Sequence, residues 1–208
     1  MKRTRLSPDA RRAQLIALGV DMLATRTLDE LSVEEIAKQA GISRGLLFHY
    51  FASKQEFHVE VARAAAAELI ARTEPDRSLP PLDALRGALT AFMDYVVENP
   101  DNYKSLVRGA ASGDAEMRAI FDETRTTMAG RVVHVLAGQG TVLGPRAELA
   151  VHGWVAFVEE CVLRSIDHGV RDRDGLLEML TNALPALVAA AGEAGSGELA
   201  GFRLDQRN

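Results

Sequence analysis

The sequence predicts an all-α protein, and three observations lead to that class. Apolar residues recur at intervals of three and four along nearly every segment, which is the period of an amphipathic helix. No run of alternating apolar and polar residues indicates a half-buried strand. Residues that cap helices precede many of these segments, and glycine or proline often follows them. The length of 208 residues suits one domain, or a small domain joined to a larger one.

Four helices are expected in the first third of the chain. The first begins at Ser7-Pro8, where a capping hydroxyl precedes a proline at the first helical position. The second begins with a capping box at 32–35, and the third covers 44–50. The fourth begins with a capping box at 53–56 and runs to about residue 72. The first two helices carry apolar stripes, namely Leu15, Leu18, Gly19, Met22 and Leu23, then Val33, Ile36, Ala37 and Ala40.

Proline and glycine divide the rest of the chain into further helices. Three prolines between residues 75 and 81 end the fourth helix, and an apolar stripe from Leu82 to Val96 follows. Later helices are expected over 101–111, 115–137, 146–168 and 174–190, and Pro185 is expected to kink or shorten the last one. The predicted organisation is an N-terminal three-helix domain over 1–52, a connecting helix over 53–74, a helical domain over 75–191 and a flexible tail over 192–208.

Composition excludes several classes of protein. The single cysteine, Cys161, rules out an internal disulfide framework and a cysteine-rich zinc site. The longest stretches without a charged residue, 132–145 and 179–192, fall short of the roughly 20 residues that cross a bilayer. No apolar segment follows the basic N-terminus as it would in a secretory signal. We therefore expect a cytoplasmic protein with no membrane contact.

The net charge of −5 is unevenly distributed. Residues 1–72 have a net charge of +2, and residues 73–208 have a net charge of −7. The basic residues crowd into the first dozen positions, at Lys2, Arg3, Arg5, Arg11 and Arg12. Binding of a polyanion is one interpretation of this basic start, and a solvated, frayed terminus is the other.

Residues 28–54 carry the most specific pattern. Two short amphipathic helices joined by a tight Ala-Gly-Ile-Ser turn are what a helix-turn-helix requires. Gly41 can adopt the left-handed backbone that reverses the chain, and Ala37 lets the two helices approach closely. Ile42, Leu47 and Phe51 are expected to point inward. The outer surface of the second helix is then expected to carry Arg44, Gly45, Leu46, Phe48, His49 and Tyr50, which indicates a binding partner.

This segment resembles the helix-turn-helix of the TetR family of bacterial transcriptional regulators. The resemblance covers about 55 residues closely, and the helical remainder is similar in length and segmentation. Two positions depart from the family pattern, since Phe48 replaces a usual tyrosine that reaches a DNA phosphate, and Leu46 replaces a common threonine. The residues that match in order and spacing are Ile36-Ala37, Ala40-Gly41-Ile42-Ser43, Gly45-Leu46-Leu47-Phe48-His49-Tyr50-Phe51 and Ser53-Lys54.

The resemblance implies that the N-terminal domain binds a double-stranded DNA operator. A recognition helix enters the major groove, where Arg44 is expected to contact guanine O6 and N7. Lys54 is expected to bind a phosphate at the start of the fourth helix. Solvated surface residues, half-buried packing for Tyr50 and helix capping by the two serines are the alternatives. The candidate DNA-binding residues are Ser32, Ser43, Arg44, Gly45, Leu46, Phe48, His49, Tyr50 and Lys54, with Arg3 and Arg5 either following the DNA or disordered.

The resemblance also implies an effector pocket and a homodimer in the region past residue 75. The last two helices are expected to pair with their copies, and an intramolecular core is the alternative. Segment 152–160 is similar to that of family members linked to lipid or acyl-CoA metabolism, so an apolar small-molecule effector is expected. The pocket candidates, each with core packing or a solvated face as the alternative, are Phe92, Tyr95, Tyr103, Val107, Arg108, Phe121, Met128, Trp154 and Phe157, with Arg125, Glu159 and Glu160 as further polar partners.

These expectations combine into one functional hypothesis and two alternatives. The hypothesis is a ligand-responsive repressor, released by its effector from a near-palindromic operator. An enzyme is disfavoured because the sequence has no phosphate-binding glycine loop, zinc-type spacing or nucleophile elbow, so no catalytic residue, cofactor or metal is expected. The enzymatic alternative is a thiol dyad of Cys161 with His134, His152 or His168. The other alternative is an adaptor that binds protein through residues 44–50.

Overall fold

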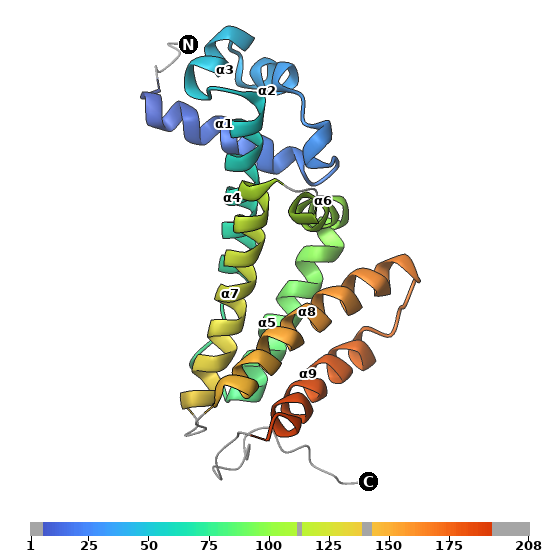
Figure 1. The fold of residues 1–208 in the computed structure, drawn as a ribbon. Coiled ribbons are helices and arrows are strands. Elements are labelled where there is room, and N and C mark those ends of the chain that lie inside the picture. Colours follow the sequence, from blue (N-terminus) through green and yellow to red (C-terminus); the bar gives the residue numbers. More distant parts are fainter. Residues whose placement is uncertain (1–5, 112–113, 139–142, 193–208) are drawn as a thin grey trace. The chain divides into compact units, whose positions relative to one another are not determined.

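The computed structural model describes residues 6–111, 114–138 and 143–192, apart from several side chains between 102 and 111. This part of the chain is built from α-helices and one 3₁₀ turn and contains no β-strand, so the all-α prediction is confirmed (Figure 1). None of the helices in these ranges is both long and apolar enough to cross a bilayer. By their contacts the residues form two compact units: unit 1 is Met1–Glu68 with Glu98–Phe121, and unit 2 is Leu69–Val97 with Asp122–Asn208.

Unit 1 contains the predicted helix-turn-helix. All of its α-helices were expected at these positions, whereas the 3₁₀ turn η1 was not predicted. Residues 98–121 fall within the predicted C-terminal domain, yet Leu106, Met117 and Ile120 join the core of unit 1. The elements of unit 1 are α1 (Pro8–Met22), η1 (Leu28–Glu30), α2 (Val33–Ala40), α3 (Arg44–Tyr50), most of α4 (Lys54–Arg72), α6 (Pro100–Ala111) and the start of α7 (Ala115–Gly138).

Local chemistry sets the ends and the packing of these helices. Ser7 caps α1 by accepting a hydrogen bond from the Ala10 N–H at 3.2 Å. Gly41 ends α2 in the left-handed conformation, with φ 63° and ψ 39°, as the turn requires. Gly19 lets α1 pack directly on α4, because a Cβ at this position would lie 2.5 Å from a methyl carbon of Val61. The glycine in the predicted apolar stripe is therefore a close-packing position.

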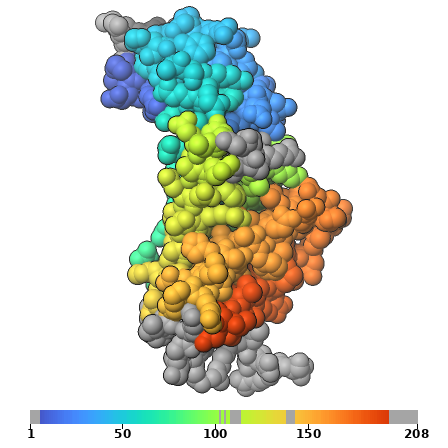
Figure 2. All heavy atoms as spheres, viewed as in Figure 1, coloured from blue at the N-terminus to red at the C-terminus, as the bar shows by residue number. Residues whose placement is uncertain are grey.

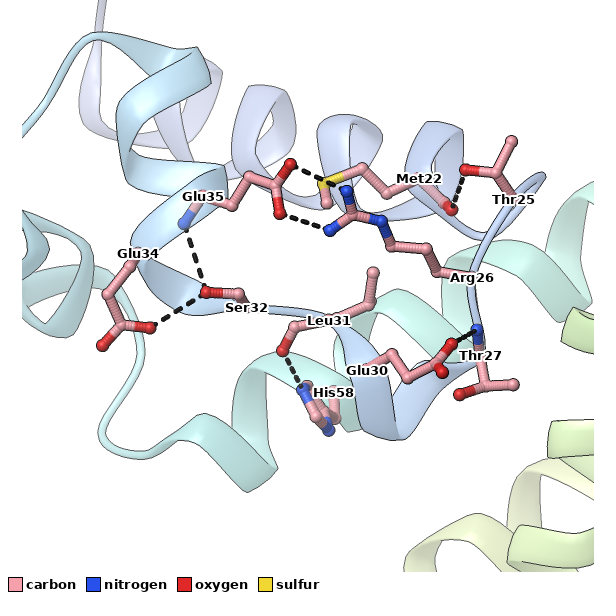
Figure 3. Close-up of polar contacts among 10 residues, drawn as sticks. All are labelled: Met22, Thr25, Arg26, Thr27, Glu30, Leu31, Ser32, Glu34, Glu35 and His58. Carbon is pink, nitrogen blue, oxygen red and sulfur yellow. Dashed lines mark hydrogen bonds and ion pairs between the residues drawn. The ribbon is translucent and has the colours of Figure 1, made fainter.

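The capping box predicted at the start of α2 is only half present (Figure 3). Ser32 accepts a hydrogen bond from the Glu35 N–H at 3.4 Å, as expected. The Glu35 carboxylate does not return to the Ser32 backbone but pairs with both terminal nitrogens of Arg26, one of them at 2.9 Å. A two-point contact with a guanidinium is stronger than one backbone hydrogen bond, so Arg26 outcompetes the cap.

Unit 2 contains the end of α4, then α5 (Pro81–Glu98), the rest of α7, α8 (Pro145–Asp167) and α9 (Arg173–Ala190). In Figure 2, α8 and α9 form one continuous outer surface of this unit. The Trp154 indole N–H donates to the Leu180 carbonyl at 2.8 Å and joins these two helices. Pro185 was expected to kink or shorten the last helix; it does not shorten it, because α9 continues to Ala190, and the kink stays a prediction. Buried Leu184 and Val188 on either side of the proline hold this part of α9.

Several predictions lie outside the described residues. They are the DNA contacts of Arg3 and Arg5, the side chain of Arg108 and the tail over 193–208. The predicted domain boundaries at residues 52, 74 and 191 also stay predictions.

Candidate nucleic-acid interface and effector cavity

The third helix, α3, is held in place by its cap and by two buried side chains. Ser43 Oγ accepts a hydrogen bond from the Leu46 N–H at 3.2 Å, so its hydroxyl caps the helix as expected. Leu47 is fully buried and Phe51 is 1% exposed, as predicted. The Phe51 ring meets the Phe57 ring edge-on at 5.0 Å, which ties the end of α3 to α4. This packing leaves the opposite side of α3 available to a partner.

The outer face of α3 is less aromatic than the sequence indicated. Leu46 is 40% exposed, and Arg44, Gly45 and His49 are also exposed. Phe48 was expected on the outside, but it is partly buried and packs against the core of unit 1. Tyr50 is also partly buried there, which is the half-buried alternative considered for it. Their large rings gain more from partial burial than from full exposure to water. The exposed surface of the helix is thus concentrated in its first half and at His49.

Arg44 has a defined position in the structure. Its Nη1 forms an ion pair with Glu34 Oε1 of α2 at 3.0 Å, and its guanidinium carbon lies 5.5 Å from the centre of the Phe48 ring. The Ser32 hydroxyl donates to Glu34 Oε2 at 3.1 Å, as Figure 3 shows. Hydrogen bonds from its own backbone N–H and from Ser32 lower the pKa of Glu34, and the charges of Arg44 and Lys54 lower it further. Glu34 is therefore ionised at neutral pH.

The remaining candidates lie at the start of α4. Lys54 is exposed at the first position of this helix. Ser53 Oγ accepts from the Glu56 N–H at 3.0 Å, and the Glu56 carboxylate accepts from the Ala52 N–H at 2.6 Å. This variant of the predicted capping box fixes the segment that carries Lys54. A cation beside a helix N-terminus is suited to a phosphate.

A buried histidine that sequence reasoning did not single out lies behind this surface. His58 of α4 is 6% exposed, and its Nε2 lies 3.4 Å from the Leu31 carbonyl (Figure 3). Burial lowers the pKa of His58, the charge of Lys54 lowers it further, and the Leu31 contact and Asp29 oppose the shift. The neutral imidazole therefore belongs to the folded unit.

Unit 2 contains a partly open apolar cavity of about 80 Å³. Three of the predicted pocket residues, Phe92, Met128 and Trp154, line it. Glu159, expected as a polar partner of the effector, also lines it. Most of the wall was not predicted, because small and medium aliphatic residues lack the bulk on which the sequence argument depended. The further lining residues are Thr73, Pro75, Leu85, Ala88, Leu89, Arg131, Val132, Val135, Val155, Val158 and Leu184.

The other pocket candidates lie elsewhere. Tyr103, Val107 and Phe121 belong to unit 1, where Tyr103 is buried and Phe121 packs against the core. Tyr95 is buried in unit 2 but does not line this cavity, and the Arg72 guanidinium lies 5.4 Å from its ring centre. Phe157 is 37% exposed on α8. Large apolar side chains on neighbouring helices thus serve cores and surfaces as well as the cavity wall.

The charged groups of the cavity wall have partners. The Arg125 Nε donates to Glu159 Oε2 at 2.5 Å, and Glu159 is 5% exposed. Arg131 of α7 forms an ion pair with Glu74 and donates to the Ile70 carbonyl at 2.8 Å, at the end of α4. This second arginine was missed because its partners are about sixty residues away in the sequence. Arg131 joins the cavity wall to the C-terminal end of α4.

The enzymatic alternative gains no support from the geometry. In the described ranges, no hydrogen bond joins Cys161 to a histidine, and no group of three or more potential ligands could hold a metal ion. Burial and the charge of Glu160 raise the pKa of the Cys161 thiol. A raised pKa disfavours the thiolate that nucleophilic chemistry requires.

Comparisons with known proteins agree with this architecture. The family profile described as "Bacterial regulatory proteins, tetR family" matches residues 15–61, and "Tetracyclin repressor-like, C-terminal domain" matches residues 81–187. The transcriptional activator FasR of Mycolicibacterium smegmatis is 24% identical over 159 residues, which cover 74% of this chain and 71% of FasR. The repressor KstR2 of Mycobacterium tuberculosis H37Rv is 37% identical over 90 residues, only 42% of this chain and 45% of KstR2.

Solved structures share the fold over most of the chain. A tetR-family transcriptional regulator from Streptomyces coelicolor is 30% identical, with a TM-score of 0.78 over 90% of this chain and 84% of that chain. The regulator FadR from Bacillus subtilis, solved in complex with stearoyl-CoA, has the same fold at 18% identity, with a TM-score of 0.62 over 85% of this chain and 97% of FadR. This chain therefore belongs to the TetR family and is a DNA-binding transcriptional regulator, not an enzyme.

Proposed function

We propose that this regulator is a homodimeric repressor that leaves a near-palindromic operator when a small, largely apolar effector binds. The observation that carries the proposal is the apolar cavity of unit 2, in a chain whose unit 1 presents a firmly packed helix-turn-helix. A protein that only bound DNA would gain stability by filling such a cavity, because voids in a core destabilise it. Binding DNA places this activity in the cytoplasm of a bacterium.

On the DNA side, the first half of α3 reads bases and the surrounding residues hold the backbone. Arg44 contacts a guanine, and the methyl groups of exposed Leu46 contact a thymine methyl. Gly45 lets the backbone approach the DNA, while His49, Tyr50 and Lys54 contact bases or phosphates. Ser32 and Ser43 fix α2 and α3 through their caps, and Phe48 supports the Arg44 side chain.

The dimer forms through α8 and α9. After one face of each helix is buried within unit 2, large apolar side chains remain outside, including Phe157, Met179 and Leu187. Met179, Ala183 and Leu187 recur every four residues, so they share a face of α9. Two copies of α3 in such a dimer would read half-sites about 34–36 Å apart, one helical turn of DNA.

The effector acts through a shape change. An engineered apolar cavity of about 150 Å³ admits benzene, and the cavity of unit 2 measures about 80 Å³. An acyl chain of a lipid-like or acyl-CoA-like effector must therefore widen it. Widening would displace Arg131 and with it the end of α4, whose residues contribute to both units. The effector therefore favours a conformation with wrongly spaced recognition helices, because it binds that conformation more tightly than the DNA-binding one.

Selection of random duplex DNA on the purified protein at two salt concentrations tests the DNA half of the proposal. Enrichment of a palindrome supports it, and enrichment of no sequence at either salt contradicts it. Stearoyl-CoA and neutral 1-decanol are then titrated into the complex with the selected duplex, and release by either supports the effector half. A reporter gene behind the palindrome separates a repressor from an activator, a distinction that matters because FasR is an activator and KstR2 a repressor.

A further inference from the structure

We propose that Glu34, which lies outside the recognition helix, positions Arg44 for base reading and weakens binding to DNA of the wrong sequence. This inference rests on the proposed role of Arg44 in reading a guanine. The sequence indicated Glu34 only as part of a helix cap. Its carboxylate instead faces the one arginine of α3.

The geometry holds the Arg44 side chain at two points. Glu34 Oε1 lies 3.0 Å from Nη1, and the Phe48 ring lies 5.5 Å from the guanidinium carbon. Glu34 is itself held, because its other oxygen accepts from the Ser32 hydroxyl at 3.1 Å. No hydrogen bond to another described residue uses Nε or Nη2 of Arg44. That edge carries the two parallel N–H groups that a bidentate contact to guanine needs.

The pair is too exposed to serve folding. The side chains of Arg44 and Glu34 are 64% and 57% exposed, and exposed ion pairs contribute little to stability. A flexible arginine loses rotamer freedom when it binds, and holding it beforehand reduces that loss. The effect of Glu34 therefore falls on the conformation of Arg44 before DNA arrives. Phe48, which departs from the family pattern, provides the other side of the same support.

The charge of Glu34 has a second effect. A carboxylate beside the DNA-binding surface repels phosphates of every sequence, because it opposes the counterion release that drives non-specific binding. Lys54, the predicted phosphate ligand at the start of α4, is near enough for its charge to lower the pKa of Glu34. At a site with the right guanine, the oriented Arg44 offsets this repulsion. Glu34 thus raises the ratio of specific to non-specific affinity.

Two substitutions of Glu34 separate orientation from charge. Glu34→Ala removes both the carboxylate and its contact, whereas Glu34→Gln removes the charge and keeps an oxygen that can accept from Arg44. Arg44→Ala and the double variant complete a mutant cycle, and Asp29→Asn is the control that removes a carboxylate elsewhere in unit 1. Fluorescence anisotropy then measures affinity of each full-length variant for the selected palindrome, for palindromes changed at single positions and for random duplex.

Glu34→Ala should lower the preference for one base pair per half-site by about fivefold to tenfold, part of what a bidentate contact provides. That position should be the one relaxed by Arg44→Ala, and Glu34→Ala should have no further effect there in the Arg44→Ala background. Glu34→Gln should lose less of this base preference than Glu34→Ala. Both variants should bind random duplex as tightly as the original chain, or more tightly. Asp29→Asn should change no single-position preference.

A uniform change at all positions, or an effect that persists in the Arg44→Ala background, overturns the inference. If Arg44→Ala relaxes no position, base reading by Arg44 fails and the inference fails with it. If Arg44→Ala relaxes the base preference at one position and both Glu34 variants retain that preference, the role of Glu34 is wrong and base reading by Arg44 stands. Melting curves check that each variant is folded, and Glu34→Gln, which keeps the side-chain volume, carries the comparison if Glu34→Ala is unstable.

Discussion

Replacing Ala88 with leucine should fill the cavity of unit 2 and abolish the effector response while leaving operator binding intact. Ala88 lies on α5 and lines the cavity of about 80 Å³. At about 24 cal/mol per Å³, a void of this size corresponds to about 2 kcal/mol of stability. Overpacking costs about 1–3 kcal/mol. The variant should therefore stay within about 1 kcal/mol of the original chain.

Thermal melting without the effector measures the stability of the variant, and melting with the effector measures its ability to bind. A ligand at about 100 times its Kd stabilises a protein by about 2.7 kcal/mol, which raises the Tm of a chain this long by about 5–10 °C. The Ala88→Leu variant should show no such shift. Ala71→Leu, at an exposed position of α4, is the matched control and should keep it. A full shift in a normally folded Ala88→Leu variant would show that the ligand binds elsewhere and refute the cavity argument.

The further predictions concern helix packing, pH dependence, phosphate binding and dimerisation. Gly19→Ala should destabilise the protein by up to about 2 kcal/mol in urea unfolding, because overpacking against α4 outweighs the better helix propensity of alanine. Gly130→Ala, at an exposed helical site, should instead stabilise it by about 0.5–1 kcal/mol. Because folding lowers the pKa of His58, the neutral imidazole should contribute its whole stabilisation above about pH 6.5, and this contribution should be lost as the pH falls towards the folded pKa. Thermal melts of the His58→Gln variant should lack that pH dependence. Lys54→Ala should weaken binding to all sequences and lower the salt slope by about one per subunit in anisotropy titrations, whereas a loss confined to one base pair would contradict a phosphate contact. Phe157→Arg should convert the proposed dimer into a folded monomer in analytical ultracentrifugation, and an unchanged dimer would rule out α8 as the interface.

The helix ends were predictable because the groups that set them are close in sequence. Ser43 caps α3 through a residue three positions on, and Gly41 ends α2 by its own backbone conformation. The half-formed capping box shows where local reasoning stops. Glu35 carries the residue type that a cap requires, but folding brings Arg26 within reach, and that contact depends on how the end of α1 returns past α2.

The candidate sites were predictable to different degrees for the same reason. Exposure of Arg44 and His49 follows from the period of one helix, but the partial burial of Phe48 depends on packing within the whole unit. The cavity depends on several helices at once, so size and hydrophobicity alone did not separate Phe92, which lines it, from Phe157, which does not. A periodic pattern identifies which face of a helix is apolar, and only the assembled helices determine what that face meets.

The arginines of the two units differ in a way that restricts how the effector can act. Arg44 has an exposed partner, Glu34, and an exposed pair of this kind contributes little to stability. Glu159 in the cavity wall is 5% exposed and pairs with the partly buried Arg125, so removing the guanidinium from this carboxylate costs more than separating an exposed pair. An anionic effector gains little by competing for such a partner, so its charged group should stay outside the cavity while its apolar part enters. Neutral 1-decanol should then release the operator through the same apolar contacts as stearoyl-CoA, and release by stearoyl-CoA alone would show that the charged group is recognised after all.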